Sequence, residues 1–179
     1  MFLNNKYCFV AATFMAITAC AQQPTGTPQT KSGYPLTKGG YPLVQQLDKS
    51  VTYASAADMA ALIDKAQKES KDGAAIVVGE FLKLAPYTVN LEYREKGKIG
   101  DVGNHPKDVE LVYVLQGSGT LVTGGKPAAD RMSIEGGESQ KIGKGDFILI
   151  PEGVPHWISH EDQTIVLMSV HMPRPVPAK

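Results

Sequence analysis

The chain has 179 residues, of which 42% are hydrophobic, and 18 basic side chains balance 18 acidic ones. This length and composition are typical of one globular domain with additional tails. Because the charges balance and no stretch is rich in lysine and arginine, nucleic acid is not expected as a partner.

The N-terminal sequence MFLNNKYCFVAATFMAITAC has the pattern of a bacterial export signal. Lys6 precedes an apolar run of about a dozen residues, which is too short to cross a bilayer and suits a signal-peptide core. The sequence ITAC, ending at Cys20, resembles the lipobox of bacterial lipoproteins, in which the signal is cut before the cysteine and that cysteine is acylated. We therefore expect residues 1–19 to be a signal peptide and Cys20 to carry a lipid, the only contact with a membrane. The protein would then be exported to the bacterial cell envelope as a periplasmic or surface lipoprotein, the alternative being an ordinary secretory signal cut nearby.

Residues 20–50 are rich in Gln, Pro, Thr, Gly and Lys, and this composition predicts a flexible tether between the membrane and the domain. The segment contains Gly-Tyr-Pro-Leu twice, and its prolines argue against regular secondary structure. In an alternative interpretation, the second copy docks on the domain through Tyr41 and Leu43.

Residues 51–74 contain a strong helix pattern. Ser55 suits an N-cap, with Asp58 placed three residues later as in a capping box. An apolar stripe follows at helical spacing, formed by Met59, Leu62, Ile63 and Ala66. We expect this helix to cover one side of the domain.

From residue 75 onward the chain consists of short β-rich segments, such as AAIVVGEF, YTVNLEYRE and QTIVLMSVHM, separated by Gly, Pro and Asp. About seven or eight such segments in about a hundred residues favour an all-β sandwich or small barrel over a βαβ fold. The predicted domain spans residues 75–173 and is followed by a short C-terminal tail, residues 174–179.

The histidines of the chain all lie in this β-rich half, at His105, His156, His160 and His171. The stretch GDFILIPEGVPHWISH has the spacing G-x5-P-x-G-x2-H-x3-H and ends at His160. The earlier stretch, residues 97–117, has the spacing G-x5-G-x-H-x4-E-x6-G and contains His105 and Glu110. These spacings resemble the two motifs of the cupin superfamily, usually written G-x5-H-x-H-x3,4-E-x6-G and G-x5-P-x-G-x2-H-x3-N.

The resemblance implies the cupin fold, a double-stranded β-helix or small jelly-roll barrel, of the single-domain cupin 2 type. Strand geometry is compatible with it, because alternate side chains of a strand share one face. Pro106 suits a turn that returns Glu110 to a position opposite His105. His156, from the second motif, then meets both of them inside the barrel.

Two imidazoles and one carboxylate form a donor set for a divalent transition metal, namely Fe, Mn, Ni, Zn or Cu. Cupins typically use three histidines and one glutamate, whereas here Gly103 occupies the position of the first histidine. Three alternatives therefore remain open. Water fills the vacant position, His160 or His171 supplies a replacement from another strand, or the site has lost its metal.

A metal held by His105, Glu110 and His156 would act on a small polar molecule, as in a cupin oxygenase, isomerase or lyase. His160 and Asp101 are the candidate catalytic acid/base residues. The same pocket also fits a non-catalytic protein that binds a small ligand, or a structural envelope lipoprotein with a degenerate metal site. Association into a homodimer is a further expectation from the family resemblance.

Overall fold

The structure is a computed structural model that describes residues 31, 33–38 and 40–174. The predicted signal peptide, Cys20 and most of the C-terminal tail lie outside these residues. The elements, in chain order, are β1 (Leu43–Gln45), α1 (Ala56–Lys71), β2 (Ile76–Leu84), β3 (Tyr87–Arg94), β4 (Asp108–Gln116), β5 (Ser118–Thr123), β6 (Lys126–Pro127), β7 (Ile134–Glu135), β8 (Glu138–Gly143), β9 (Phe147–Ile150), β10 (His156–Glu161) and β11 (Ile165–Pro173).

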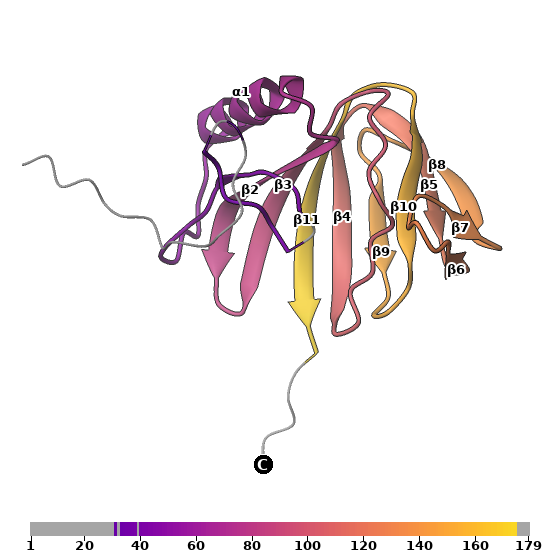
Figure 1. Ribbon diagram of the computed structural model, residues 1–179. Helices are drawn as coiled ribbons and strands as arrows, with labels where there is room; N and C mark the ends of the chain where they lie inside the picture. The colour runs from indigo at the N-terminus through magenta and orange to yellow at the C-terminus, as the bar shows by residue number, and fades with distance from the viewer. Residues whose placement is uncertain (1–30, 32, 39, 175–179) are drawn as a thin grey trace, which may run out of the picture.

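The strands form two facing sheets, as predicted for an all-β jelly-roll barrel. A six-stranded sheet has the order β1-β2-β3-β11-β4-β9, and a three-stranded sheet has the order β10-β5-β8. Strands β6 and β7 form a separate pair. Figure 1 shows the larger sheet with α1 at one end and the strands of the smaller sheet beyond β9. The last strand, β11, lies between β3 and β4, so the end of the chain is placed in the middle of the larger sheet.

Helix α1 begins as the sequence predicts. The Ser55 side chain accepts a hydrogen bond from the Asp58 backbone N–H, and the Asp58 carboxylate accepts one from the Ser55 backbone N–H. Leu62 and Ala66 are buried against the six-stranded sheet, with Met59 and Ile63 packed beside them. In the described residues no helix is both long enough and apolar enough to cross a membrane.

The six-stranded sheet is covered on both faces, and this determines where the site lies. Its outer face packs under α1 through residues such as Leu91, Tyr93 and Val166. Its inner face packs toward the smaller sheet through a second apolar cluster, formed by Val112, Val114, Leu121, Ile142, Ile150, Ile158, Ile165 and Leu167. Successive residues of β3 and β11 therefore alternate between two buried environments.

The end of the predicted tether, residues 20–50, belongs to the domain instead. Leu43 pairs with Val78 in a parallel arrangement, and Val44 is only 1% exposed in the core under α1. The Tyr41 hydroxyl accepts a hydrogen bond from the Asp101 backbone N–H, at 3.3 Å. The second Gly-Tyr-Pro-Leu copy thus docks on the domain, because apolar Leu43 and Val44 gain more from burial than from solvent exposure.

Candidate metal centre

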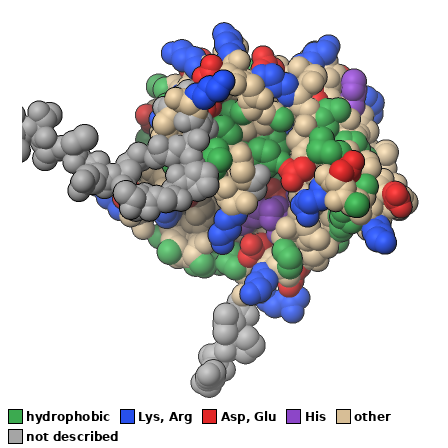
Figure 2. All heavy atoms as spheres, viewed as in Figure 1, with side chains coloured by type: hydrophobic (Ala, Val, Ile, Leu, Met, Phe, Trp, Pro, Cys, Tyr) green, Lys and Arg blue, Asp and Glu red, His purple; other side chains and the backbone are tan. Residues whose placement is uncertain are grey.

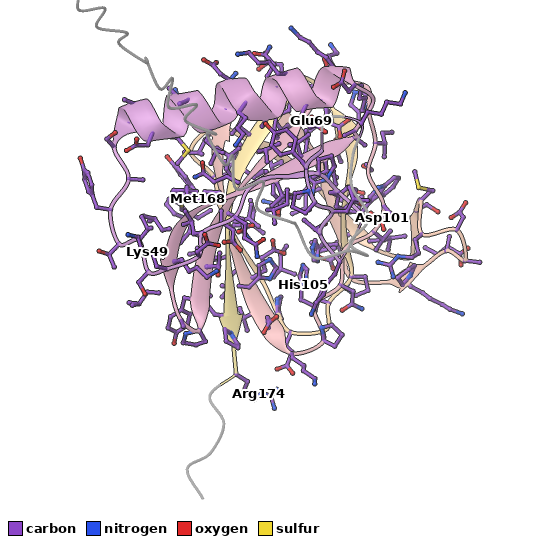
Figure 3. All side chains as sticks on the ribbon, turned by 60° about the vertical axis from the view of Figure 1, so that its left-hand side comes forward. Lys49, Glu69, Asp101, His105, Met168 and Arg174 are labelled. Atoms are coloured by element: carbon purple, nitrogen blue, oxygen red, sulfur yellow. The ribbon has the colours of Figure 1, made fainter. Side chains whose placement is uncertain are left out.

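Three histidines surround one buried glutamate inside the barrel. Glu110 lies on β4 directly opposite His171 on β11. His156 is the first residue of β10, in the other sheet, and His105 lies in the segment that precedes β4. We call these four residues the histidine–glutamate cluster. Figure 3 shows His105 well separated from α1, and Figure 2 shows histidine atoms at the centre of one face beside acidic and basic side chains.

The distances within the cluster centre on the Glu110 carboxylate, which is 4% exposed. Its Oε2 lies 3.1 Å from the His156 Nε2 and 3.3 Å from the His105 Nε2. Its Oε1 lies 3.9 Å from the His171 Nε2. One ligand atom each of His105, Glu110 and His171 lie within 4.8 Å of one another.

The orientation of His156 leaves a lone pair facing Glu110. The His156 Nδ1 lies 3.1 Å from the Val154 carbonyl oxygen, which can only accept, so Nδ1 carries the proton. In the neutral ring, Nε2 is then unprotonated and cannot donate to Glu110. Despite the short distances, Oε2 of Glu110 is buried without a hydrogen-bond partner among the described residues.

These features fit a divalent cation. Ligand atoms about 2.1 Å from a metal and at right angles to each other lie roughly 3.0 Å apart, close to the separations around Oε2. A buried carboxylate oxygen without a donor, facing an imidazole lone pair, is costly unless a cation lies between them. The Nδ1 contact of His156 with a backbone carbonyl is also how metal-binding histidines are commonly oriented.

The protonation equilibria of the cluster are coupled through the same contacts. Burial by itself would raise the pKa of Glu110, but protonated imidazoles beside the carboxylate, first of all that of His105, outweigh burial and lower this pKa in the metal-free cluster. The contact with Glu110 raises the pKa of His105, against the opposing effect of burial, and the charges of Glu92 and Asp108 add to the increase. Glu110 is therefore an anion in the cluster at neutral pH.

The glycine at the position of the missing histidine has a steric reason. Gly103 and His156 exchange two backbone hydrogen bonds, of 2.8 Å and 3.0 Å. A Cβ at residue 103 would lie 2.4 Å from the His156 Nε2, which is too close for any side chain. The His156 ring therefore occupies the space that a residue-103 side chain would need.

Of the two residues expected as replacements for the missing histidine, only His171 lies in the cluster. His160 is 64% exposed and pairs with Asp162 at 3.4 Å instead. His160 does not share the inward face of His156, because the pairing of β10 with β5 shifts register between Ile158 and His160. This irregularity reverses the alternation of the last two residues, so Glu161 points inward.

The cluster opens into a cavity of about 560 Å³, within the usual range for small-molecule sites. Its apolar lining comes from the inner core, including Val112, Ile150 and Leu167. Asp101 also lines it, as the sequence suggests, with its Oδ2 3.6 Å from the Arg131 Nε. His160 is not among the lining residues.

Sequence reasoning missed a polar strip on β3. Asn90, Glu92 and Arg94 line the cavity, whereas Leu91 and Tyr93 between them pack under α1. An alternating strand normally presents its polar residues to solvent, so the pattern alone suggests the opposite orientation. The helix signal at residues 56–71 is the clue, because a helix covering the outer face forces the polar residues inward.

Part of the chain matches a known protein family, and several solved structures resemble it. Residues 91–171 match the family Cupin_2, described as a cupin domain. A protein of Bacillus halodurans is 22% identical over 51% of this chain and 65% of its own length, with a TM-score of 0.40. A predicted oxalate decarboxylase of Thermotoga maritima is 15% identical over 55% of this chain and 81% of its own, with a TM-score of 0.45.

An oxalate decarboxylase of Bacillus subtilis is 20% identical over 49% of this chain and only 21% of its own length, with a TM-score of 0.40. No curated protein matches the chain. Residues 91–171 thus match a cupin domain, the sheets have the jelly-roll arrangement, and this region contains a histidine–glutamate group able to hold a metal.

Proposed function

We propose that this cupin domain binds a divalent transition metal through His105, Glu110 and His156, with His171 as a further ligand. The observation that carries the proposal is the buried Glu110 Oε2, which has two imidazole nitrogens within 3.3 Å but forms no hydrogen bond with the described part of the chain. His171 would take the role that Gly103 cannot fill. Four ligands of this type suit Fe, Mn, Ni, Zn or Cu.

The proposed activity is on a small polar molecule in the cavity. A metal bound here would supply Lewis acidity or dioxygen activation. Glu110 would offset part of its charge, and the Val154 carbonyl would hold the His156 ring in place. The apolar lining would limit access of water, and Asp101 remains the candidate acid/base residue at the cavity wall.

Metal analysis of the purified full-length protein tests the proposal. We expect about one metal ion per chain, and a loss of affinity of at least about tenfold in His105→Ala and in His156→Ala. His160→Ala is the matched control and should bind metal as the unchanged protein does. Substoichiometric metal that is indifferent to the first two substitutions would contradict the proposal.

Turnover separates an enzyme from a protein that only binds a ligand. In the metal-loaded protein, dioxygen uptake or loss of substrate that depends on His105 would identify an enzyme. Ligand binding without turnover would identify the non-catalytic alternative.

We also propose that the protein is exported as a lipoprotein anchored through Cys20, on the basis of its N-terminal sequence. Cys20→Ser should release the protein from the membrane fraction. Continued membrane association of this variant would count against lipidation.

A further inference from the structure

The cavity has a second polar group, separate from the histidine–glutamate cluster. Asn90, Glu92 and Arg94 occupy alternate positions of β3 and line the same cavity. Glu92 has both carboxylate oxygens occupied, since Ser169 donates to Oε1 at 3.1 Å and the Arg94 Nη2 donates to Oε2 at 2.9 Å. Glu92 is therefore satisfied by its protein neighbours.

Arg94 is not satisfied in this way. Its side chain is 14% exposed, and its Nε is buried without a hydrogen-bond partner among the described residues. A guanidinium has five N–H donors, and the hydrogen bond to Glu92 uses one of them. The charge of Arg94 also acts on the buried Glu161 carboxylate, but the Arg94 Nε and the Glu161 Oε1 both lack a hydrogen-bond partner among the described residues. Buried donors usually have an acceptor, so Arg94 is equipped for an oxygen-bearing group that enters the cavity.

The position of Arg94 indicates the length of such a ligand. On the larger sheet, Thr88 pairs with His171, which in turn pairs with Glu110. Arg94 is on the same strand as Thr88 and six residues further along, so its backbone lies about 20 Å from the row of the cluster. The Arg94 guanidinium reaches back to Glu92, which is four residues from Thr88, so about 13 Å remain between it and the row of the cluster.

The charge of the cavity depends on the metal. Three basic and four acidic side chains line the cavity, namely Lys38, Arg94 and Arg131 against Glu92, Asp101, Asp108 and Glu110. Acidic side chains therefore exceed basic ones by one, and a bound divalent cation would change the formal net charge of the lining from negative to positive. A metal-loaded cavity therefore favours an anionic ligand.

We propose that Arg94 binds the carboxylate of an elongated small organic acid whose other, oxygen-bearing end reaches the histidine–glutamate cluster. Planar two-point pairing with a carboxylate is the geometry that a guanidinium favours. The Asn90 amide lies on the same face of β3, two strand positions from Glu92, and adds a neutral donor beside the ligand. This assignment rests on the proposed function for the metal-bound end, whereas the Arg94 end does not require the metal.

The test uses hexanoate and its neutral isostere hexanamide with the metal-free protein, and sebacate with the metal-loaded protein. We expect hexanoate to bind more tightly than hexanamide, and Arg94→Gln to weaken hexanoate binding at least about tenfold. Sebacate should lose affinity both in Arg94→Gln and on removal of the metal. Lys141→Gln removes an exposed positive charge outside the cavity and should change none of these affinities.

Two further variants keep the proposal testable if Arg94→Gln does not fold. Arg94→Lys keeps the charge without the planar fork and should bind hexanoate less tightly than the unchanged protein. Glu92→Gln removes the competing carboxylate and should bind hexanoate at least as tightly. Equal affinity for hexanoate and hexanamide, or hexanoate binding indifferent to Arg94, would overturn this proposal, whereas loss of metal binding alone would overturn only the proposed metal site.

Discussion

Gly103 and His156 depend on each other at the level of single atoms. The ring of His156 lies where a residue-103 side chain would be, and the Val154 carbonyl fixes the ring in that position. Restoring a histidine at residue 103 would therefore displace a proposed ligand instead of adding one. In the proposed site, His171 provides the imidazole that residue 103 cannot provide.

Gly103→Ala tests this dependence. The added Cβ would lie 2.4 Å from the His156 Nε2, so the ring must move away from Glu110. We expect metal affinity to fall at least about tenfold, measured by competition with a chromophoric chelator. Gly143→Ala is the control, because the nearest atom to its added Cβ is 3.9 Å away, and it should leave metal affinity unchanged.

Glu161 gives a second prediction at this scale. The residue is 2% exposed, and burial raises the pKa of its carboxyl group, with Arg94 acting in the opposite direction. Because the folded pKa lies above the unfolded one, the folded state binds more protons and loses stability as the pH rises above about 4.5. Glu161→Gln should lack this loss, so its gain in melting temperature over the unchanged protein should be larger at pH 7 than at pH 4. An equal gain at both pH values would contradict the assignment.

At the scale of elements, the N-terminal cap of α1 contributes measurably to the stability of the folded protein. Ser55 and Asp58 form a reciprocal capping box at the N-terminus of the helix that covers the larger sheet. Ser55→Ala should lower the free energy of unfolding by about 1 kcal/mol, measured by urea denaturation. Ser139→Ala, at an exposed strand position, should have a smaller effect. If Ser55→Ala leaves the free energy of unfolding unchanged, α1 is held in place by packing alone.

The strands show how far the sequence predicts the site. The resemblance of the two motifs to those of cupins predicted that His105, Glu110 and His156 lie together, and in the structure the Glu110 carboxylate lies within 3.3 Å of both imidazoles. The sequence did not predict the exposure of His160, because an irregularity in β10 changes which side chains of this strand face the barrel interior. Such a shift depends on pairing with β5, and local sequence does not encode it.

The orientation of β3 likewise could not be predicted from the sequence of that strand alone. Whether Glu92 or Leu91 faces the cavity depends on which face of the sheet α1 covers, and that is a property of the whole fold. His171 was placed only as an alternative, because its register against Glu110 depends on β11 entering between β3 and β4. Pairing between distant segments determines both outcomes.

At the scale of the whole molecule, the cluster joins the two sheets. Glu110 and His171 come from the larger sheet and His156 from the smaller one. A metal held by all three would link the layers and stabilise the folded state, by about 2.7 kcal/mol at a free metal concentration one hundred times the dissociation constant. Removing the metal with a chelator should therefore lower the melting temperature of the entire domain.

The stabilisation should depend on pH. In the metal-free protein the lowered pKa of Glu110 contributes stability above about pH 4.5, and this is lost as the pH falls. The raised pKa of His105 contributes stability below about pH 6.5, and this is lost as the pH rises through the folded value. Metal needs deprotonated imidazoles, so the increase in melting temperature on adding Zn²⁺ should grow from pH 5.5 to pH 7.5. A metal effect that is constant over this range would argue against binding at His105.

The central claim is a metal held by three imidazoles and one carboxylate, and X-ray absorption spectroscopy of the metal-loaded protein tests it most directly. The account predicts nitrogen and oxygen ligands at about 2.0–2.2 Å, with multiple-scattering features that indicate three imidazoles and fall to two in His171→Ala. A spectrum without imidazole scattering, or one that is the same in His171→Ala, would contradict it.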